Sequence, residues 1–190
     1  MKIYLATTNP KKLKELSAIF EDVPGLTFAL PEGLPEVEET GTTFAENAML
    51  KAEAGMRALN APCLADDSGL AVDALDGRPG VYSARYAPTD AERIAKLLGE
   101  LEGVPAVRRT AAFVSAMALA FPDGRRIEVE GRCAGVITEA PRGEGGFGYD
   151  PVFLVPERGQ TFAELPASVK NAISHRAIAA QRLKQKLIEG

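Results

Sequence analysis

The stretch from Thr110 to Phe121 is apolar and rich in alanine, so its own periodicity suits a buried helix and a buried strand equally well. The residues that follow decide between the two. Asp123-Gly124 is a frequent hairpin turn, and apolar and acidic residues then alternate from Ile127 to Glu130, as they do in a half-buried strand. We therefore predict a long β-hairpin that pairs roughly residues 110–121 with residues 125–137.

Strand-like and helix-like segments alternate along the rest of the chain. Capping boxes at Thr43–Glu46 and Thr89–Glu92 mark two helix starts, and Asn9 before Pro10 marks another. On the helix expected from Thr43 to about Leu59, Asn47 and Lys51 share a polar face, which is functional only if it lines a cleft. The other expected segments are strands at 3–7, 26–30, 62–65, 70–75 and 151–155, and a mostly helical segment at about 168–188.

Length and charge narrow the class of protein. A chain of 190 residues with 46% hydrophobic content suffices for one domain, or two closely packed lobes, with a substantial core. The net charge of −4 argues against a partner that is a nucleic-acid polymer or a membrane surface, while a small phosphorylated ligand remains possible. No apolar run is long enough to span a bilayer, and the N-terminus enters a strand pattern directly, so we expect no signal peptide.

The metal-ligating residue types are few. The two cysteines, Cys63 and Cys133, form no disulfide framework and fit a reducing compartment, so we expect a cytoplasmic protein. The single histidine, His175, excludes a zinc site built from several histidines of one chain. Carboxylate-held Mg²⁺ is therefore the favoured type of metal site.

Adjacent carboxylates lie within the apolar stretch from Leu64 to Leu70. Asp66 and Asp67 repel each other at a strand end unless a cation or a shared proton relieves them, which favours a Mg²⁺ site with one acid left to handle a proton. Gly69 is expected to take positive φ in the turn that follows. An Asp-Asp-Ser-Gly surface turn is an equally good interpretation of this stretch alone.

Anion binding is suggested at the first predicted helix. Lys11, Lys12 and Lys14 lie in its first turns, after a strand and a tight turn, where backbone N–H groups also favour an anion. An ordinary capped helix with a solvated basic face explains the pattern as well.

A glycine-rich loop runs from Arg142 to Asp150. It contains a formal GxGxxG, but the expected strand at 151–155 replaces the helix that a dinucleotide site requires, so we reject that function. Phe147 and Tyr149 offer aromatic faces and their backbone offers N–H donors for a purine. Alternatively, the loop is only a glycine-rich connection between strands, and its aromatic side chains belong to the core.

Five stretches taken together resemble the inosine/xanthosine triphosphate pyrophosphatases. They are Thr7–Lys12, Glu38–Gly41 with Phe44–Ala48, Leu64–Leu70, Gly146–Pro151 and Ser174–Arg176. The similarity lies in their order and spacing, and it covers nearly the whole chain. The resemblance implies one domain over residues 1–190, with an α/β fold in which a long, curved mixed sheet is flanked by helices and two lobes enclose a central cleft. It also implies a homodimer.

The implied reaction is hydrolysis of ITP, dITP or XTP to the monophosphate and pyrophosphate with Mg²⁺. By resemblance, Glu39 and Asp67 bind the metal, Asp67 also accepts a proton from the attacking water, and Asp66 and Lys51 complete the catalytic site. The implied substrate-binding residues are Thr7, Thr8, Asn9, Pro10, Lys11 and Lys12 around the triphosphate, Ser68, and, around the base, Phe147, Gly148, Tyr149, Asp150, Lys170, His175 and Arg176. Thr8 departs from the pattern, because many relatives have glycine there.

Two other classes remain open. A non-catalytic nucleotide sensor would keep the lysines and the aromatic loop but would not need Glu39 with Asp67. A phosphomonoesterase with an aspartyl nucleophile would release inorganic phosphate, although no Asp-x-Asp motif follows the first strand.

Overall fold

The computed structural model describes residues 1–189, apart from the side chains of Lys11 and Glu15, and it divides into two compact units. Unit 1 comprises Met1–Asp67, Ser115–Gly131 and the C-terminal segment from Arg176. Unit 2 comprises Ser68–Val114 and Arg132–His175. Each unit buries its own set of apolar side chains.

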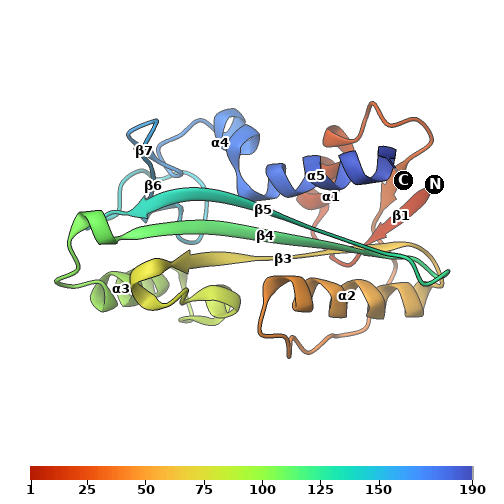
Figure 1. Cartoon of the computed structure of the whole chain (residues 1–190), viewed down its shortest axis with the longest axis horizontal. Helices are drawn as coiled ribbons and strands as arrows, with labels where there is room; N and C mark the ends of the chain where they lie inside the picture. The colour runs from red at the N-terminus through yellow and green to blue at the C-terminus, as the bar shows by residue number, and fades with distance from the viewer. Residues whose placement is uncertain (190) are drawn as a thin grey trace. The chain divides into compact units, whose positions relative to one another are not determined.

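Within the described residues, seven strands form one mixed sheet in the order β2-β1-β3-β4-β5-β6-β7 (Figure 1). β1 runs parallel to β2 and β3, whereas β6 is antiparallel to β5 and β7. The bounds are β1 (Lys2–Leu5), β2 (Thr27–Ala29), β3 (Cys63–Val72), β4 (Thr110–Ala120), β5 (Arg126–Ile137), β6 (Phe153–Val155) and β7 (Gln160–Thr161). The α/β class and the long hairpin, β4 with β5, are confirmed.

Five α-helices lie within the described residues, and the first three begin where the capping signals predict. They are α1 (Pro10–Ile19), α2 (Phe44–Leu59), α3 (Asp90–Glu100), α4 (Ala167–Ile173) and α5 (His175–Glu189). Both capping boxes form: Thr43 and Thr89 each accept a hydrogen bond from the N–H of the glutamate three residues on, whose carboxylate accepts one in return. The predicted C-terminal helical segment is divided at Ser174, which no local signal had indicated.

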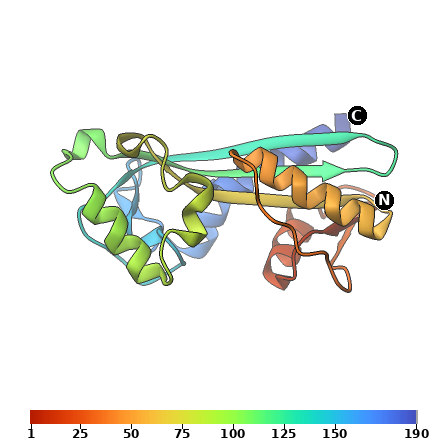
Figure 2. The ribbon, with the colours of Figure 1, turned by 90° about the horizontal axis from the view of Figure 1, so that it is seen from below.

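Helices cover both faces of the sheet within unit 1, with α2 on one face and α1 and α5 on the other (Figure 1). Figure 2, which views the molecule from below, shows α2 running along β3. Because successive side chains of a strand point to opposite faces of the sheet, β4 places small and large apolar residues on different faces. Its alanines at 116, 118 and 120 pack with Ala48 and Ala52 of α2, whereas Met117 and Leu119 pack with α1 and α5.

Aromatic side chains fill much of the core of unit 2. The rings of Phe113 and Phe162 are stacked with centroids 5.6 Å apart, and Phe153 contacts both. Leu97 of α3 packs into the same core. Among the described helices, none is long and apolar enough to cross a membrane.

One expectation about local structure is wrong. The stretch Asp66–Gly69 is not a turn but the middle of β3, and Gly69 has no positive φ. The error comes from tertiary packing, because neighbouring strands and helices bury polar residues that are typical of turns. Asn47, expected on a polar face of α2 with Lys51, is buried, with an exposed fraction of 0%.

Candidate active site

Lys51 lies at the centre of a group of charges in unit 1. Its Nζ is 2.9 Å from Glu39 Oε1 and 3.1 Å from Asp67 Oδ1, so one ammonium holds two carboxylates together. Burial lowers the pKa of Lys51, but the two carboxylates raise it above its ordinary value, and the lysine stays charged. Burial raises the pKa of Asp67 above that of an ordinary aspartate, and the charge of Lys51 offsets only part of this effect.

Asn47 connects α2 to the loop that carries Glu39. Its Oδ1 accepts a hydrogen bond of 2.8 Å from the Gly41 N–H. Its amide also lies close enough to the Asp67 carboxyl to lower the pKa of that group. However, Asn47 Nδ2 and Asp67 Oδ2 do not reach hydrogen-bond geometry, and both are buried without another partner among the described residues. Asp67 therefore has one oxygen paired with Lys51 and a second oxygen buried beside the Asn47 amide.

Asp66 belongs to a second group of charges in unit 1. It receives Lys12 Nζ of α1 at 2.5 Å, and Arg176 Nε of α5 lies 3.5 Å from its other oxygen. Burial raises the pKa of Asp66, but Lys12 and Arg176 outweigh burial and bring the pKa below that of an ordinary aspartate. Asp66 is thus a charged anchor that fixes two cations.

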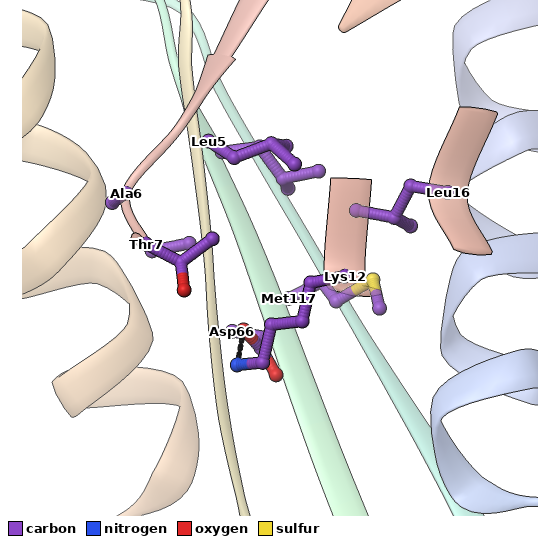
Figure 3. Close-up of a pocket in the computed structure, with 9 residues that line it drawn as sticks. Leu5, Ala6, Thr7, Lys12, Leu16, Asp66 and Met117 are labelled. Atoms are coloured by element: carbon purple, nitrogen blue, oxygen red, sulfur yellow. Dashed lines mark hydrogen bonds and ion pairs between the residues drawn. The ribbon is translucent and has the colours of Figure 1, made fainter. Parts of the chain in front are cut away.

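The loop before α1 lies beside this anchor. Thr7, Lys12 and Asp66 line a small pocket with the apolar side chains of Leu5, Leu16 and Met117 (Figure 3). Thr7 Oγ1 accepts a hydrogen bond of 3.2 Å from the Asn9 N–H. Thr8 and Pro10 are exposed, and Thr8 has no positive φ, so its backbone needs no glycine. The side chain of Lys11 lies outside the described part of the chain.

Unit 2 brings together three residues that were expected near the base. Phe147 is 68% exposed, and Lys170 Nζ lies 4.8 Å from the centre of its ring. Lys170 also forms an ion pair with Asp150, which accepts a hydrogen bond of 2.9 Å from the Phe147 N–H. Asp150 is only 3% exposed, so it supports the loop from inside. An exposed ring next to a fixed cation is a suitable surface for stacking a base.

Other residues expected to contact the base have roles within the protein. Tyr149 is buried, and its hydroxyl donates a hydrogen bond of 2.8 Å to the Ser83 carbonyl, so its ring is a core side chain. His175 stacks on Phe113 with ring centroids 5.0 Å apart. The N–H of Gly148 donates to Asp90 at 2.8 Å. With the Phe147 N–H bonded to Asp150, this contact weakens the expectation that the loop backbone binds a purine oxygen.

The donor set determines which metals suit unit 1. Glu39 and Asp67 supply oxygen ligands, and Lys51 already holds them together. Within the described chain, no group of three or more histidine, cysteine, aspartate or glutamate residues could hold a metal ion. This pair of carboxylates fits Mg²⁺, which commonly takes one or two carboxylates together with water and substrate phosphates.

Sequence reasoning missed the contacts of Asn47 and of Asp90. Asn47 is expected from the sequence on a polar face with Lys51, but its burial and its bond to Gly41 depend on the packing of α2 against the sheet. Asp90 had been seen only as part of a capping box, yet it reaches a loop 58 residues away. No local pattern indicates either contact.

Comparison with known proteins gives a family and close relatives. The model of the Ham1 family matches residues 3–186. A dITP/XTP pyrophosphatase of Geobacillus kaustophilus is 56% identical over 97% of this chain and 93% of that protein. One of Geobacter sulfurreducens is 51% identical over 98% of this chain and 96% of that protein.

Solved structures agree with this result. A HAM1 protein from Coxiella burnetii superimposes with a TM-score of 0.94 at 42% identity, covering 100% of both chains. A nucleoside-triphosphatase, or dITP/XTP pyrophosphatase, from Mycobacterium abscessus gives a TM-score of 0.83 at 47% identity, covering 96% of this chain and 98% of the other.

Proposed function

The chain belongs to the Ham1 family, and from this premise we propose that it hydrolyses the purine nucleoside triphosphates ITP, dITP and XTP to the monophosphate and pyrophosphate. Its close relatives are named for dITP and XTP. The observation that carries the proposal is Lys51 with its two carboxylates, Glu39 and Asp67. A protein that only bound nucleotides would not need this arrangement.

Asp67 is the proposed general base. One oxygen is fixed by Lys51, and the other is buried without a formed hydrogen bond. A base must be ionised and must have a free acceptor, and the raised pKa of Asp67 also increases its affinity for a proton. Asp67 accordingly orients a water molecule and takes its proton as the water attacks phosphorus. General-base assistance of this kind contributes about 10²–10⁴-fold to a rate.

The triphosphate carries several negative charges that repel an attacking water. Lys12 and Lys51 provide fixed positive charge, and the loop from Thr7 to Asn9 provides hydroxyl and backbone groups next to the start of α1. Glu39 and Asp67 would hold Mg²⁺, which when bound neutralises phosphate charge and polarises the bond to be broken. Asp66 keeps Lys12 in place for this task.

Base recognition is assigned to Phe147 and Lys170 in unit 2, with His175 and Arg176 as further candidates. Hypoxanthine and xanthine have an acceptor oxygen at the 6-position, whereas adenine has an amino donor there. Cationic donors such as Lys170 therefore favour the first two bases, and ATP should be a poor substrate. The guanidinium of Arg176 already forms an ion pair with Asp66, so Arg176 contributes to base recognition only if it binds the base while it keeps this ion pair.

Product identification tests the proposal. The purified protein is incubated with ITP and Mg²⁺, and IMP with pyrophosphate is the expected result. Inorganic phosphate in place of pyrophosphate would indicate a phosphomonoesterase, and nucleotide binding without turnover would indicate a sensor. The proposal also includes a homodimer and a cytoplasmic location, and size-exclusion chromatography with light scattering tests the dimer.

A further inference from the structure

The loop from Gly146 to Asp150 presents Phe147 to solvent without the support of a regular element at that point. The ring is 68% exposed, and Lys170 Nζ lies 4.8 Å from its centre, so little packing holds the ring in place. Backbone contacts therefore help to fix its direction. Two carboxylates make these contacts: Asp150 accepts from the Phe147 N–H at 2.9 Å, and Asp90 accepts from the Gly148 N–H at 2.8 Å.

Asp90 lies in the first turn of α3, where its side chain is 49% exposed and is oriented by an ion pair. Its Oδ1 is 2.6 Å from Arg93 Nη1, so Oδ2 is left for Gly148. Arg93 is fixed in turn, because its Nε donates to the Ala87 carbonyl at 2.9 Å. A hydrogen bond from an N–H to a charged carboxylate is stronger than one between neutral groups. The chain Ala87–Arg93–Asp90–Gly148 thus connects the loop to α3.

The helix does not need Asp90 for its start. Thr89 and Glu92 form the complete capping box of α3, with hydrogen bonds of 3.2 Å from the Glu92 N–H to Thr89 Oγ1 and 3.0 Å from the Thr89 N–H to Glu92 Oε2. Asp90 adds favourable charge at the helix N-terminus, as Glu92 also does. Asp90 differs from Glu92 in its contact with the Gly148 N–H, and this contact stabilises the loop rather than the helix.

Phe147 lies between two glycines with positive φ, +72° at Gly146 and +61° at Gly148. Glycine populates positive and negative φ about equally, so the backbone beside Phe147 has no intrinsic preference for the observed conformation. A charged acceptor on the Gly148 N–H selects this one conformation. Without it, the ring of Phe147 would sample several directions, and each binding event would have to order it.

We propose that Asp90 is a positioning residue for purine recognition: by holding the Gly148 N–H, it fixes Phe147 in the orientation that stacks on the base. The inference rests on the proposed function, and specifically on the role of Phe147 there. In this role Asp90 contacts no substrate and acts only through the loop.

Matched variants at the start of α3 separate the loop contact from helix capping. Asp90→Ala and Glu92→Ala each remove one acid from the first turn, but only the first removes the contact with Gly148. Asp90→Ala should raise KM for ITP about five-fold, the loss expected for one hydrogen bond, with kcat nearly unchanged. Glu92→Ala should lower Tm without changing KM. Asp90→Asn, whose amide oxygen can still accept from Gly148, should restore part of the affinity.

A double-mutant cycle with Phe147→Ala tests whether Asp90 acts through the ring. If it does, Asp90→Ala should raise KM much less in the Phe147→Ala background than in the wild type. Equal effects in both backgrounds, or equal KM values for Asp90→Ala and Glu92→Ala, would overturn the inference while leaving the proposed function intact. Absence of pyrophosphate release by the wild-type protein would instead overturn the proposed function.

Discussion

Asp66 and Asp67 are neighbours in β3, yet their carboxylates point to opposite faces of the sheet in unit 1. Asp66 meets Lys12 of α1 at 2.5 Å, and Asp67 meets Lys51 of α2 at 3.1 Å. The reason is the two-residue period of a strand, which a turn would not impose. The adjacent acids therefore do not share one cation, as the sequence had suggested. Each has its own lysine, and their pKa values shift in opposite directions.

Asp67→Asn should lower kcat for ITP by about 10²-fold or more, because the amide keeps the shape of the side chain but can neither accept a proton nor carry the charge. The measurement is kcat at saturating ITP and Mg²⁺, with Tm recorded to show that the variant is folded. A kcat close to that of the wild type would remove Asp67 from the role of base.

Asp66→Asn should destabilise the protein more at neutral pH than in acid. The pKa of Asp66 is lowered in the folded state, so its contribution is present above the unfolded value of about 3.9 and is lost as pH falls through the folded pKa. The difference in Tm between wild type and variant should therefore stay constant from pH 7 to about pH 4 and shrink as pH falls below that value.

The control for this experiment is Asp76→Asn. Asp76 is exposed in a turn with φ of +54°, a conformation that asparagine tolerates. Its effect on Tm should be small at every pH. A Tm difference for Asp66→Asn that stays constant even below about pH 4 would contradict the charged state of Asp66.

Lys12→Ala and Lys51→Ala should each lower kcat/KM for ITP, dITP and XTP by similar factors. A point charge that binds phosphate carries no information about the base, so the ranking of the three substrates should remain that of the wild type. Steady-state kinetics with all three nucleotides measures this. A several-fold change in the ITP-to-XTP ratio for either variant would assign that lysine to base recognition instead.

Local signals were sufficient for much of the fold. The Asp123-Gly124 turn and the alternation after it gave the β4–β5 hairpin, and both capping boxes located helix starts. The continuous strand β3 was not predictable, because Asp66, Asp67 and Gly69 are all typical of turns. Only the neighbouring strands and the lysines of α1 and α2 make a strand favourable there. The cleft between lobes and the homodimer stay predictions.

The sequence identified most residues of the candidate site but not the contacts between them. Lys12, Lys51, Asp66 and Asp67 were identified by resemblance, but which lysine meets which acid follows from the face of β3 that each acid occupies. The roles of Asn47 and Asp90 depend on contacts between segments that are distant in sequence or separated by a loop. Such contacts leave no periodic signal.

Two helical glycines should respond oppositely to alanine. A Cβ at Gly55 of α2 would collide with Cys63 Sγ, whereas a Cβ at Gly99 of α3 meets no atom within 4 Å. Gly55→Ala should therefore lower Tm, since overpacking costs about 1–3 kcal/mol. Gly99→Ala should raise Tm by a few degrees, through the roughly 0.5–1 kcal/mol by which alanine is the better helix former. Thermal denaturation of both variants is the measurement, and a loss of Tm for Gly99→Ala would contradict it.

Small side chains set the distance between α2 and the sheet. Ala48 and Ala52 pack with Ala65 and the alanines of β4, and the larger side chains of Phe44, Met49 and Met56 are partly buried against this alanine cluster. Lys51 and Asn47 belong to α2, and Asp67 belongs to β3. The thickness of the alanine layer between these two elements therefore sets the distance from Lys51 Nζ to Asp67 Oδ1. Larger residues at Ala48 or Ala52 should therefore lower turnover even in variants that remain folded, although these positions touch no nucleotide.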